Sequence, residues 1–248
     1  MIITIANRRG GVGKTITAHA LGAGLKARGK SILFIDLDSQ CNLSYDTGST
    51  TTGVTVFDVL TRRADIKDAI QHTESGDILS GSPRLASADL ILTETGKEYR
   101  LREQLEQVKN NYDYCIIDTP PALGILTVNA LTASDKVIIP VQAEIHSING
   151  VALIGETIET VKRYTNKDLQ VEGILITRYN ARSILARDMA DNLSEQAKNL
   201  HTKVFDTKIR ECVSLKESQA VQRNIFSYAP RSNGAKDYNA VIEEILRG

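Results

Sequence analysis

The chain has 248 residues, of which 42% are hydrophobic and 24% charged, and its 30 basic residues balance its 30 acidic ones. This length suits one domain or at most two, and we predict a single domain over residues 1–248. Because the charges balance, the composition excludes a general electrostatic attraction to nucleic acid or anionic lipid, and any such binding would need a local patch.

Short apolar, β-branched runs alternate along the chain with longer segments of helical pattern. The strand-like runs lie at 2–6, 31–36, 113–118, 136–141 and 172–177, with a weaker candidate at 77–81. The amphipathic segments lie at 17–30, 98–111 and 150–164, and a Ser/Thr/Gly-rich loop is expected at 45–55. Runs that are apolar on both faces predict a parallel sheet covered on both sides. With right-handed crossovers this is an α/β fold with a doubly wound, mostly parallel sheet, which binds ligands at the carboxyl ends of its strands.

The glycine-rich stretch NRRGGVGKTIT follows the first apolar run and occupies residues 7–17. Its three glycines are Gly10, Gly11 and Gly13. They let successive backbone N–H groups converge on an anion, and a helix predicted to start near Lys14 adds the positive end of its dipole. In such a loop Lys14 reaches the β- and γ-phosphates and the hydroxyl of Thr15 holds Mg²⁺. The alternative is a plain glycine-rich turn, but GKT between a buried strand and a helix favours phosphate binding.

Aspartates end two of the predicted strands. Asp36 and Asp38 close the run at 31–36, and a spacing of two on a strand puts both carboxylates on one side, near the glycine-rich loop. Asp118 closes the run at 113–118, in the form in which an aspartate holds Mg²⁺ through water. Such carboxylates suit phosphoryl transfer, which needs a positioned water and charge compensation. The alternative for the paired aspartates is that they only cap the next helix.

The segment RRGGVGKT resembles the deviant Walker A motif KGGxGKS/T of the ParA/MinD family of P-loop ATPases. The resemblance covers essentially the whole chain and is closest to ParA/Soj partition ATPases. In that family the first lysine of the motif reaches across a nucleotide-sandwiched dimer to the partner subunit's phosphates, and Arg9 stands in its place here. Arg8 fills the slot that strict Walker loops give to glycine. Ile16 replaces a threonine that binds the α-phosphate, which should weaken nucleotide binding by about one hydrogen bond.

The resemblance implies ATP and Mg²⁺ as cofactors and assigns a role to each site residue. Asp36 and Asp118 would act through the water shell of the metal, Asp38 would orient or deprotonate the attacking water, and the DTPP segment that begins at Asp118 would be a switch. The expected catalytic residues are Lys14, Asp38 and Arg9. The expected ATP-binding residues are Arg9, Gly10, Gly11, Val12, Gly13, Lys14, Thr15, Ile16, Asn180 and Arg182. Asn180 would bind the edge of the adenine, although both Asn180 and Arg182 are also ordinary loop residues.

One stretch departs from the family pattern. Residues 209–220 read IRECVSLKESQA, where the family commonly reads close to IPRNVxLxEAP. The prolines and the Arg–Asn pair are missing, so this stretch does not predict the contacts that the family makes there at the nucleotide edge and the dimer interface.

DNA partition is the function that this resemblance implies. Such proteins form a homodimer around ATP, bind DNA non-specifically, and release it when a centromere-binding, ParB-like partner stimulates a slow hydrolysis. The candidate DNA contacts are Arg231 and Lys203, which should make binding steeply salt-dependent. A solvated face of mixed charge is the alternative for this region, since acidic residues are interspersed with the basic ones.

Three further functions are weighed against partition. A MinD-like positioning ATPase would need a basic amphipathic C-terminal helix for lipid, whereas the end DYNAVIEEILRG predicts a packing helix. A nucleotide switch with little hydrolysis is possible because Arg9 and Ile16 depart from the usual loop. Electron transfer would need paired cysteines, and the three cysteines are far apart without a CxxC pair.

The N-terminal sequence lacks the features of a signal peptide, and no apolar stretch reaches the ~18–20 residues of a membrane span. We therefore expect a cytoplasmic, nucleoid-associated protein that does not bind membranes.

Overall fold

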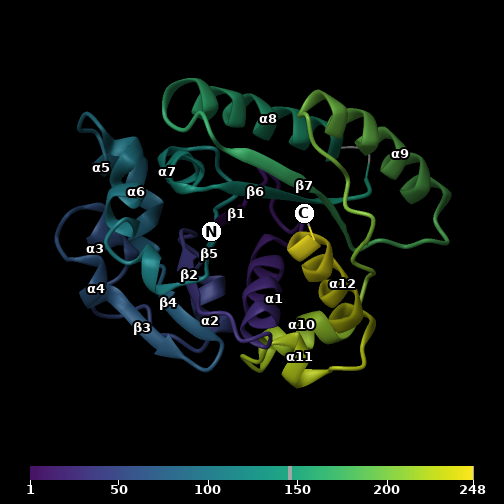
Figure 1. Cartoon of the computed structure of the whole chain (residues 1–248), viewed down its shortest axis with the longest axis horizontal. Helices are drawn as coiled ribbons and strands as arrows, with labels where there is room; N and C mark the ends of the chain where they lie inside the picture. The colour runs from purple at the N-terminus through teal and green to yellow at the C-terminus, as the bar shows by residue number, and fades with distance from the viewer. Residues whose placement is uncertain (145–146, 248) are drawn as a thin grey trace.

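A mostly parallel sheet forms the centre of the structure, a computed structural model that describes residues 1–144 and 147–247 (Figure 1). The strands within these residues are β1 (Ile2–Ile5), β2 (Ile32–Asp36), β3 (Ile70–Thr73), β4 (Gly76–Leu79), β5 (Tyr114–Asp118), β6 (Lys136–Gln142) and β7 (Gln170–Thr177). Their order is β3-β4-β2-β5-β1-β6-β7, and among the described strands the β3–β4 pair alone is antiparallel. The predicted doubly wound α/β fold is therefore confirmed.

Helices cover both faces of this sheet. They are α1 (Lys14–Lys26), α2 (Asn42–Asp46), α3 (Val56–Leu60), α4 (Ile66–Ala69), α5 (Ala88–Ile91), α6 (Arg100–Leu105), α7 (Ile125–Ala133), α8 (Ser147–Tyr164), α9 (Ile184–Asn199), α10 (Val213–Ala220), α11 (Ile225–Tyr228) and α12 (Asn233–Arg247). Short 3₁₀ turns lie at Pro83–Ser87, Lys97–Tyr99 and Lys109–Asn111. Helices α1 and α12 lie on one side of the sheet, and α7 and α8 on the other (Figure 1).

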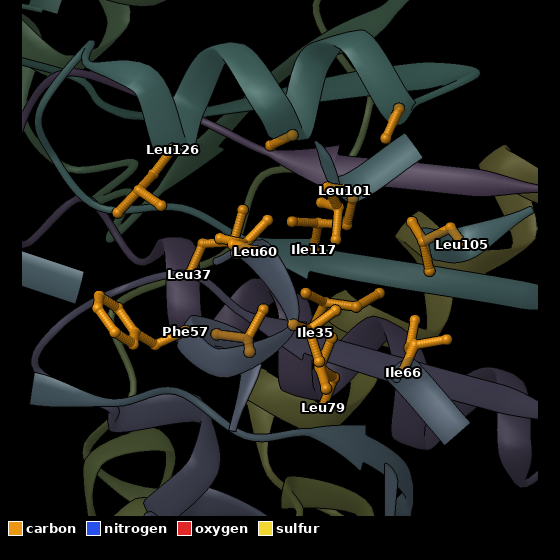
Figure 2. Close-up of a cluster of buried hydrophobic side chains, with 14 of the residues drawn as sticks. Ile35, Leu37, Phe57, Leu60, Ile66, Leu79, Leu101, Leu105, Ile117 and Leu126 are labelled. Carbon is orange, nitrogen blue, oxygen red and sulfur yellow. The ribbon is translucent and has the colours of Figure 1, made fainter. Parts of the chain in front are cut away.

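The alternation of side chains along each strand divides the core into layers. Phe34 of β2 packs with the residues of α1 and α12, whereas its neighbours Leu33 and Ile35 pack on the opposite face. Figure 2 shows that opposite cluster, in which Leu60 and Leu101 lie between the strands and the helices α3 and α6. These strands are apolar on both faces because both faces are covered.

Three local expectations are corrected. The strand β3 was not predicted, because IQHT is a short, half-exposed edge strand without an apolar run. The helix expected over 98–111 is interrupted: only α6 is α-helical, between two 3₁₀ turns. The loop expected at 45–55 begins later, since its first two residues complete α2.

The C-terminal helix α12 packs into the core, as predicted. Its residues Tyr238, Val241 and Ile242 are fully buried in the layer that contains α1. Gly24 of α1 permits this contact, because a Cβ there would lie 2.2 Å from Cδ1 of Ile242. None of the described helices has the length and apolar character needed to cross a membrane.

Candidate active site

The glycine-rich loop connects β1 to α1 at the carboxyl edge of the sheet. Gly11 and Gly13 have φ angles of +75° and +89°, a region that side chains rarely adopt. The Nε2 amide of Gln142 donates to the carbonyl of Gly11 at 2.7 Å, and the hydroxyl of Thr177 donates to that of Val12 at 2.8 Å. Side chains of β6 and β7 therefore hold the loop in place through its carbonyl groups. A Cβ at Gly10 or Gly11 would meet no atom within 4 Å.

Lys14 is folded back onto its own loop. Its Nζ donates to the carbonyl of Arg9 at 3.0 Å, and the residue is 7% exposed. Burial lowers the pKa of Lys14, and the carboxylates of Asp118 and Asp38 counteract part of this effect. These carboxylates lie close enough to act on the ammonium group, so the structure brings together three of the predicted site residues.

Thr15 and Asp118 form a direct contact. The hydroxyl of Thr15 donates to Oδ2 of Asp118 at 2.6 Å, while Oδ1 of Asp118 is buried and has no hydrogen-bond partner among the described residues. Burial raises the pKa of Asp118 well above its usual range, and the nearby charge of Asp36 adds to the shift. An unpartnered buried carboxylate oxygen is costly unless a ligand completes the site.

Asp36 is bound within the protein on both of its oxygens. The backbone N–H and the hydroxyl of Ser44 donate to Oδ2 at 2.8 Å and 2.7 Å, and the N–H of Asp38 donates to Oδ1 at 3.1 Å. Burial raises the pKa of Asp36 to about 6. Because Ser44 lies in the first turn of α2, the helix-capping alternative also describes what Asp36 does.

Asp38 lies beyond the end of β2 and not on the strand, so the expectation that both aspartates share one strand face is wrong. Its Oδ1 accepts from the backbone N–H of Gln40 at 3.0 Å, and the residue is 9% exposed. Asp38 nevertheless acts electrostatically on both Lys14 and Asp118. The chain turns immediately after the strand and still places the carboxylate beside the loop.

Arg9 extends toward the end of β6. Its Nη2 pairs with Oε2 of Glu144 at 2.6 Å, and Nη1 is buried without a partner among the described residues. The two side chains are 35% and 47% exposed. The ion pair holds the guanidinium within its own subunit, beside the loop.

Comparison with known proteins identifies the family. The model of a family described as "AAA domain" matches residues 1–171. The chain is 41% identical to the sporulation initiation inhibitor protein Soj of Bacillus subtilis, over 98% of this chain and 97% of that protein. It is 34% identical to the chromosome partitioning protein ParA of Caulobacter vibrioides, over 99% of this chain and 93% of that protein. The chain belongs to the ParA/Soj family of P-loop ATPases.

Solved structures agree with the fold. Cobyrinic acid a,c-diamide synthase from Mycobacterium smegmatis, with bound ADP and magnesium, is 32% identical with a TM-score of 0.86. The match covers 99% of this chain and 94% of that one. The same protein is also known with a bound ATP analogue and magnesium.

Where this ParA/Soj chain departs from the family pattern, a small cavity adjoins the loop. This cavity of about 140 Å³ is lined by Gly11, Gly13 and Ile16 on one side and by Cys212, Leu215 and Gln219 on the other. Helix α10, at Val213–Ala220, forms the greater part of the segment 209–220 that departs from the family. Arg210 also lines this cavity, and its guanidinium donates to both carboxylate oxygens of Asp237 in α12, at 2.6–3.2 Å.

Asn180 and Arg182 lie in the exposed loop after β7. Oδ1 of Asn180 accepts from the backbone N–H of Arg182 at 3.0 Å. Asn180 lines a cavity of about 390 Å³ together with Glu144 and Arg178, and not the smaller cavity beside the glycine-rich loop. Their role in base binding stays a prediction.

The two candidate DNA contacts are both exposed and lie on different segments. Lys203 follows α9, with Nζ 5.4 Å from the centre of the Phe205 ring, and Arg231 precedes α12. A DNA surface that contains them stays a prediction.

Several site residues were missed from the sequence. They are Ser44, Gln142, Glu144 and Thr177, which bind Asp36, Gly11, Arg9 and Val12 respectively. Gln142, Glu144 and Thr177 lie at the carboxyl ends of β6 and β7. The strand-end rule that found the aspartates would have found these three as well.

Proposed function

We propose that this chain is a DNA-partition ATPase that binds Mg²⁺·ATP, forms a homodimer with the nucleotide at the interface, and binds DNA non-specifically. Hydrolysis is slow, and a ParB-like partner stimulates it. The observation that carries the proposal is the joining of the glycine-rich loop, Lys14 and the Thr15–Asp118 pair at one sheet edge, in a chain 41% identical to Soj. The relatives named for partition support this biological process, ahead of the less similar synthase.

The loop residues fit a triphosphate. Residues 10–15 offer backbone N–H groups around an open surface and the N-terminus of α1, a 13-residue helix. Lys14 would exchange its bond to the carbonyl of Arg9 for the phosphate oxygens, and the negative charge would favour its ammonium form.

The residues also fit Mg²⁺. The donor set would be oxygen only, from Thr15 directly and from Asp36 and Asp118 through water, which matches the preference of this cation. The unpartnered Oδ1 of Asp118 supplies a buried acceptor for a bound water. No group of three or more acidic, His or Cys side chains suited to a metal occurs in the described part of the chain. Mg²⁺ in such sites is held largely by substrate phosphates and water. When bound, Mg²⁺ neutralises charge that develops on the phosphates.

Asp38 and Arg9 would perform the remaining tasks. Asp38 would accept the hydrogen bond of the attacking water and orient it in line with the γ-phosphate. Arg9 would leave Glu144 and reach the phosphates of the partner subunit, where a guanidinium binds phosphate with two parallel hydrogen bonds.

The competing functions differ in what they need from α12 and from ATP turnover. A MinD-like membrane role would need an apolar face of α12 free for lipid, and that face is buried in the core. A switch with little hydrolysis would keep ATP-dependent dimerisation but lose turnover.

The first experiment has two measurements. Light scattering gives the molar mass of the protein in the presence of Mg²⁺·ATP, and a single-turnover assay gives the rate of ATP hydrolysis with and without duplex DNA. We expect a wild-type dimer with ATP, no ATP-dependent dimer for Lys14→Ala, and a persistent ATP-bound dimer for Asp38→Ala. A wild-type rate equal to that of Asp38→Ala would favour the switch. A monomer under all conditions would refute the proposal.

The second experiment measures DNA retention by the ATP-bound protein as a function of salt. Replacing Arg231 or Lys203 by Ala should reduce the slope of log affinity against log salt by about one each if each contacts a phosphate. Lys167→Ala, an exposed lysine in the turn before β7, is the control. No retention of DNA at low salt would remove the transport mechanism.

A further inference from the structure

A charged cavity lies away from the nucleotide loop, between the helices α3, α5 and α6. It measures about 290 Å³, and its lining includes Leu60, Arg62, Arg63, Ile91, Glu94 and Arg100. In Figure 1 these three helices lie together at the outer end of the sheet, over the β3–β4 side and far from α9 and α12. None of the predicted ATP, metal or DNA residues belongs to the cavity.

The cavity carries an excess of positive charge. Three guanidinium groups line it, against the single carboxylate of Glu94. Arg62 pairs with Glu103 at 2.9 Å, with both side chains more than half exposed. Arg63 has no ion-pair partner among the described residues and lies 5.9 Å from the ring of Phe57.

Arg100 adds a buried and incompletely bonded donor. Its side chain is 6% exposed, and it pairs through Nη2 with Glu94, whose own side chain is 74% exposed. The Nε and Nη1 groups are buried without a hydrogen-bond partner in the described residues. Buried guanidinium donors are costly to leave unpaired, and an acceptor delivered to the cavity would satisfy them.

An apolar edge borders the cavity on α5. Leu90 is 83% exposed and Ile91, which lines the cavity, is 43% exposed. Two adjacent apolar side chains on one short helix would remain in water if only a small anion occupied the cavity. A protein segment can cover both and place an acidic side chain in the cavity at the same time.

We propose that this cavity and the Leu90–Ile91 edge form a docking site for a partner protein that presents a carboxylate beside an apolar side chain. The carboxylate would accept charge-assisted hydrogen bonds from the guanidinium groups of Arg63 and Arg100. The apolar side chain would lie against Leu90 and Ile91. This inference does not depend on the proposed function, because it uses none of the nucleotide residues.

The test is a selection from a displayed library of random short peptides against the full-length protein without nucleotide. We expect enriched peptides that carry Asp or Glu next to a large apolar residue. In fluorescence anisotropy these peptides should bind Arg63→Glu and Leu90→Ser at least about tenfold more weakly than wild type. Lys167→Glu changes an exposed charge elsewhere, and this variant should bind the peptides as wild type does. Lys14→Ala should also bind them as wild type does, and this control separates the test from the ATPase hypothesis.

Four results would overturn the proposal. They are the absence of any enriched peptide, enriched peptides without a carboxylate, undiminished binding by Arg63→Glu, and undiminished binding by Leu90→Ser. The last result, together with competition by inorganic phosphate, would indicate a small-anion site. Because Arg63 and Leu90 are exposed, both variants should fold, and thermal denaturation checks this.

Discussion

His19 gives a prediction whose size follows directly from its surroundings. It lies on α1, the helix that begins at the nucleotide loop, and it is 3% exposed. Its Nε2 shares a 3.1 Å hydrogen bond with the hydroxyl of Ser75, and its ring meets that of Phe34 edge-on. Burial lowers the pKa of His19 from 6.5 to about 4, because no negative group compensates a charged imidazole there.

The sign of the effect on stability follows from proton uptake. Between pH 6.5 and pH 4 the unfolded chain binds a proton at His19 and the folded protein does not, so this residue lowers the free energy of unfolding as the pH falls. The contribution is small at pH 7 and reaches about 2 kcal/mol at pH 5. Asp36 and Asp46 act in the opposite direction, because burial raises the pKa of each to about 6.

The comparison that isolates His19 is wild type against His19→Gln, in urea denaturation from pH 7.5 to pH 4.5. Glutamine keeps a hydrogen bond to Ser75 but cannot be protonated, and the carboxylates are common to both proteins. The stability difference between them should therefore shift by about 2 kcal/mol in favour of the variant from pH 7 to pH 5. Ser75→Ala should lower stability while the pH dependence from His19 remains. Equal pH profiles for wild type and His19→Gln would show that His19 is not held neutral by burial.

Three further substitutions test packing, the aspartate cluster and the loop. Gly22→Ala should lower the free energy of unfolding, measured in urea, by about 1–3 kcal/mol, because the added Cβ would lie 2.2 Å from the ring of Phe34. Unchanged stability would show that the ring moves freely. Ser44→Ala should cost about 1–3 kcal/mol in the same assay, because its buried hydroxyl donates to Asp36 and accepts from the backbone N–H of Gly81 at 2.8 Å. Ile16→Thr should tighten binding of a fluorescent ATP analogue by about fivefold, because it restores the hydroxyl that the family uses on the α-phosphate. An equal gain in Ile16→Val would instead indicate a steric effect.

The part of the fold that could be predicted is the part that local pattern determines. Buried parallel strands are continuous apolar runs, and five of them were found within a residue or two of their ends. Their carboxyl ends meet at one edge, so the loop at 7–17, Asp36 and Asp118 could be placed together from the sequence. The edge strand β3 was missed because a half-exposed strand of four residues has neither an apolar run nor a full alternation.

Contacts between distant segments could not be predicted. Gln219 of α10 donates to Asp46 of α2 at 2.7 Å across 173 positions of sequence, and Arg210 meets Asp237 across 27. Neither residue type is unusual at its own position, and only the packed structure shows that they meet. The segment 209–220 was recognised from the sequence as a departure from the family, but what replaces the family contacts became visible only in the fold.

The energy of the Arg9–Glu144 ion pair decides between two interpretations of this contact. Its ion pair with Glu144 places the guanidinium in its own subunit, which at first argues against a role across a dimer. Both side chains are more than one third exposed, however, and such a pair contributes only about 0–1 kcal/mol to stability. Hydrogen bonds from a guanidinium to a phosphate at a buried interface are worth about 1.5–3 kcal/mol each. If the proposed dimer forms, the exchange of Glu144 for a partner's phosphate would therefore be favourable, and the ion pair with Glu144 would not block the proposed role of Arg9.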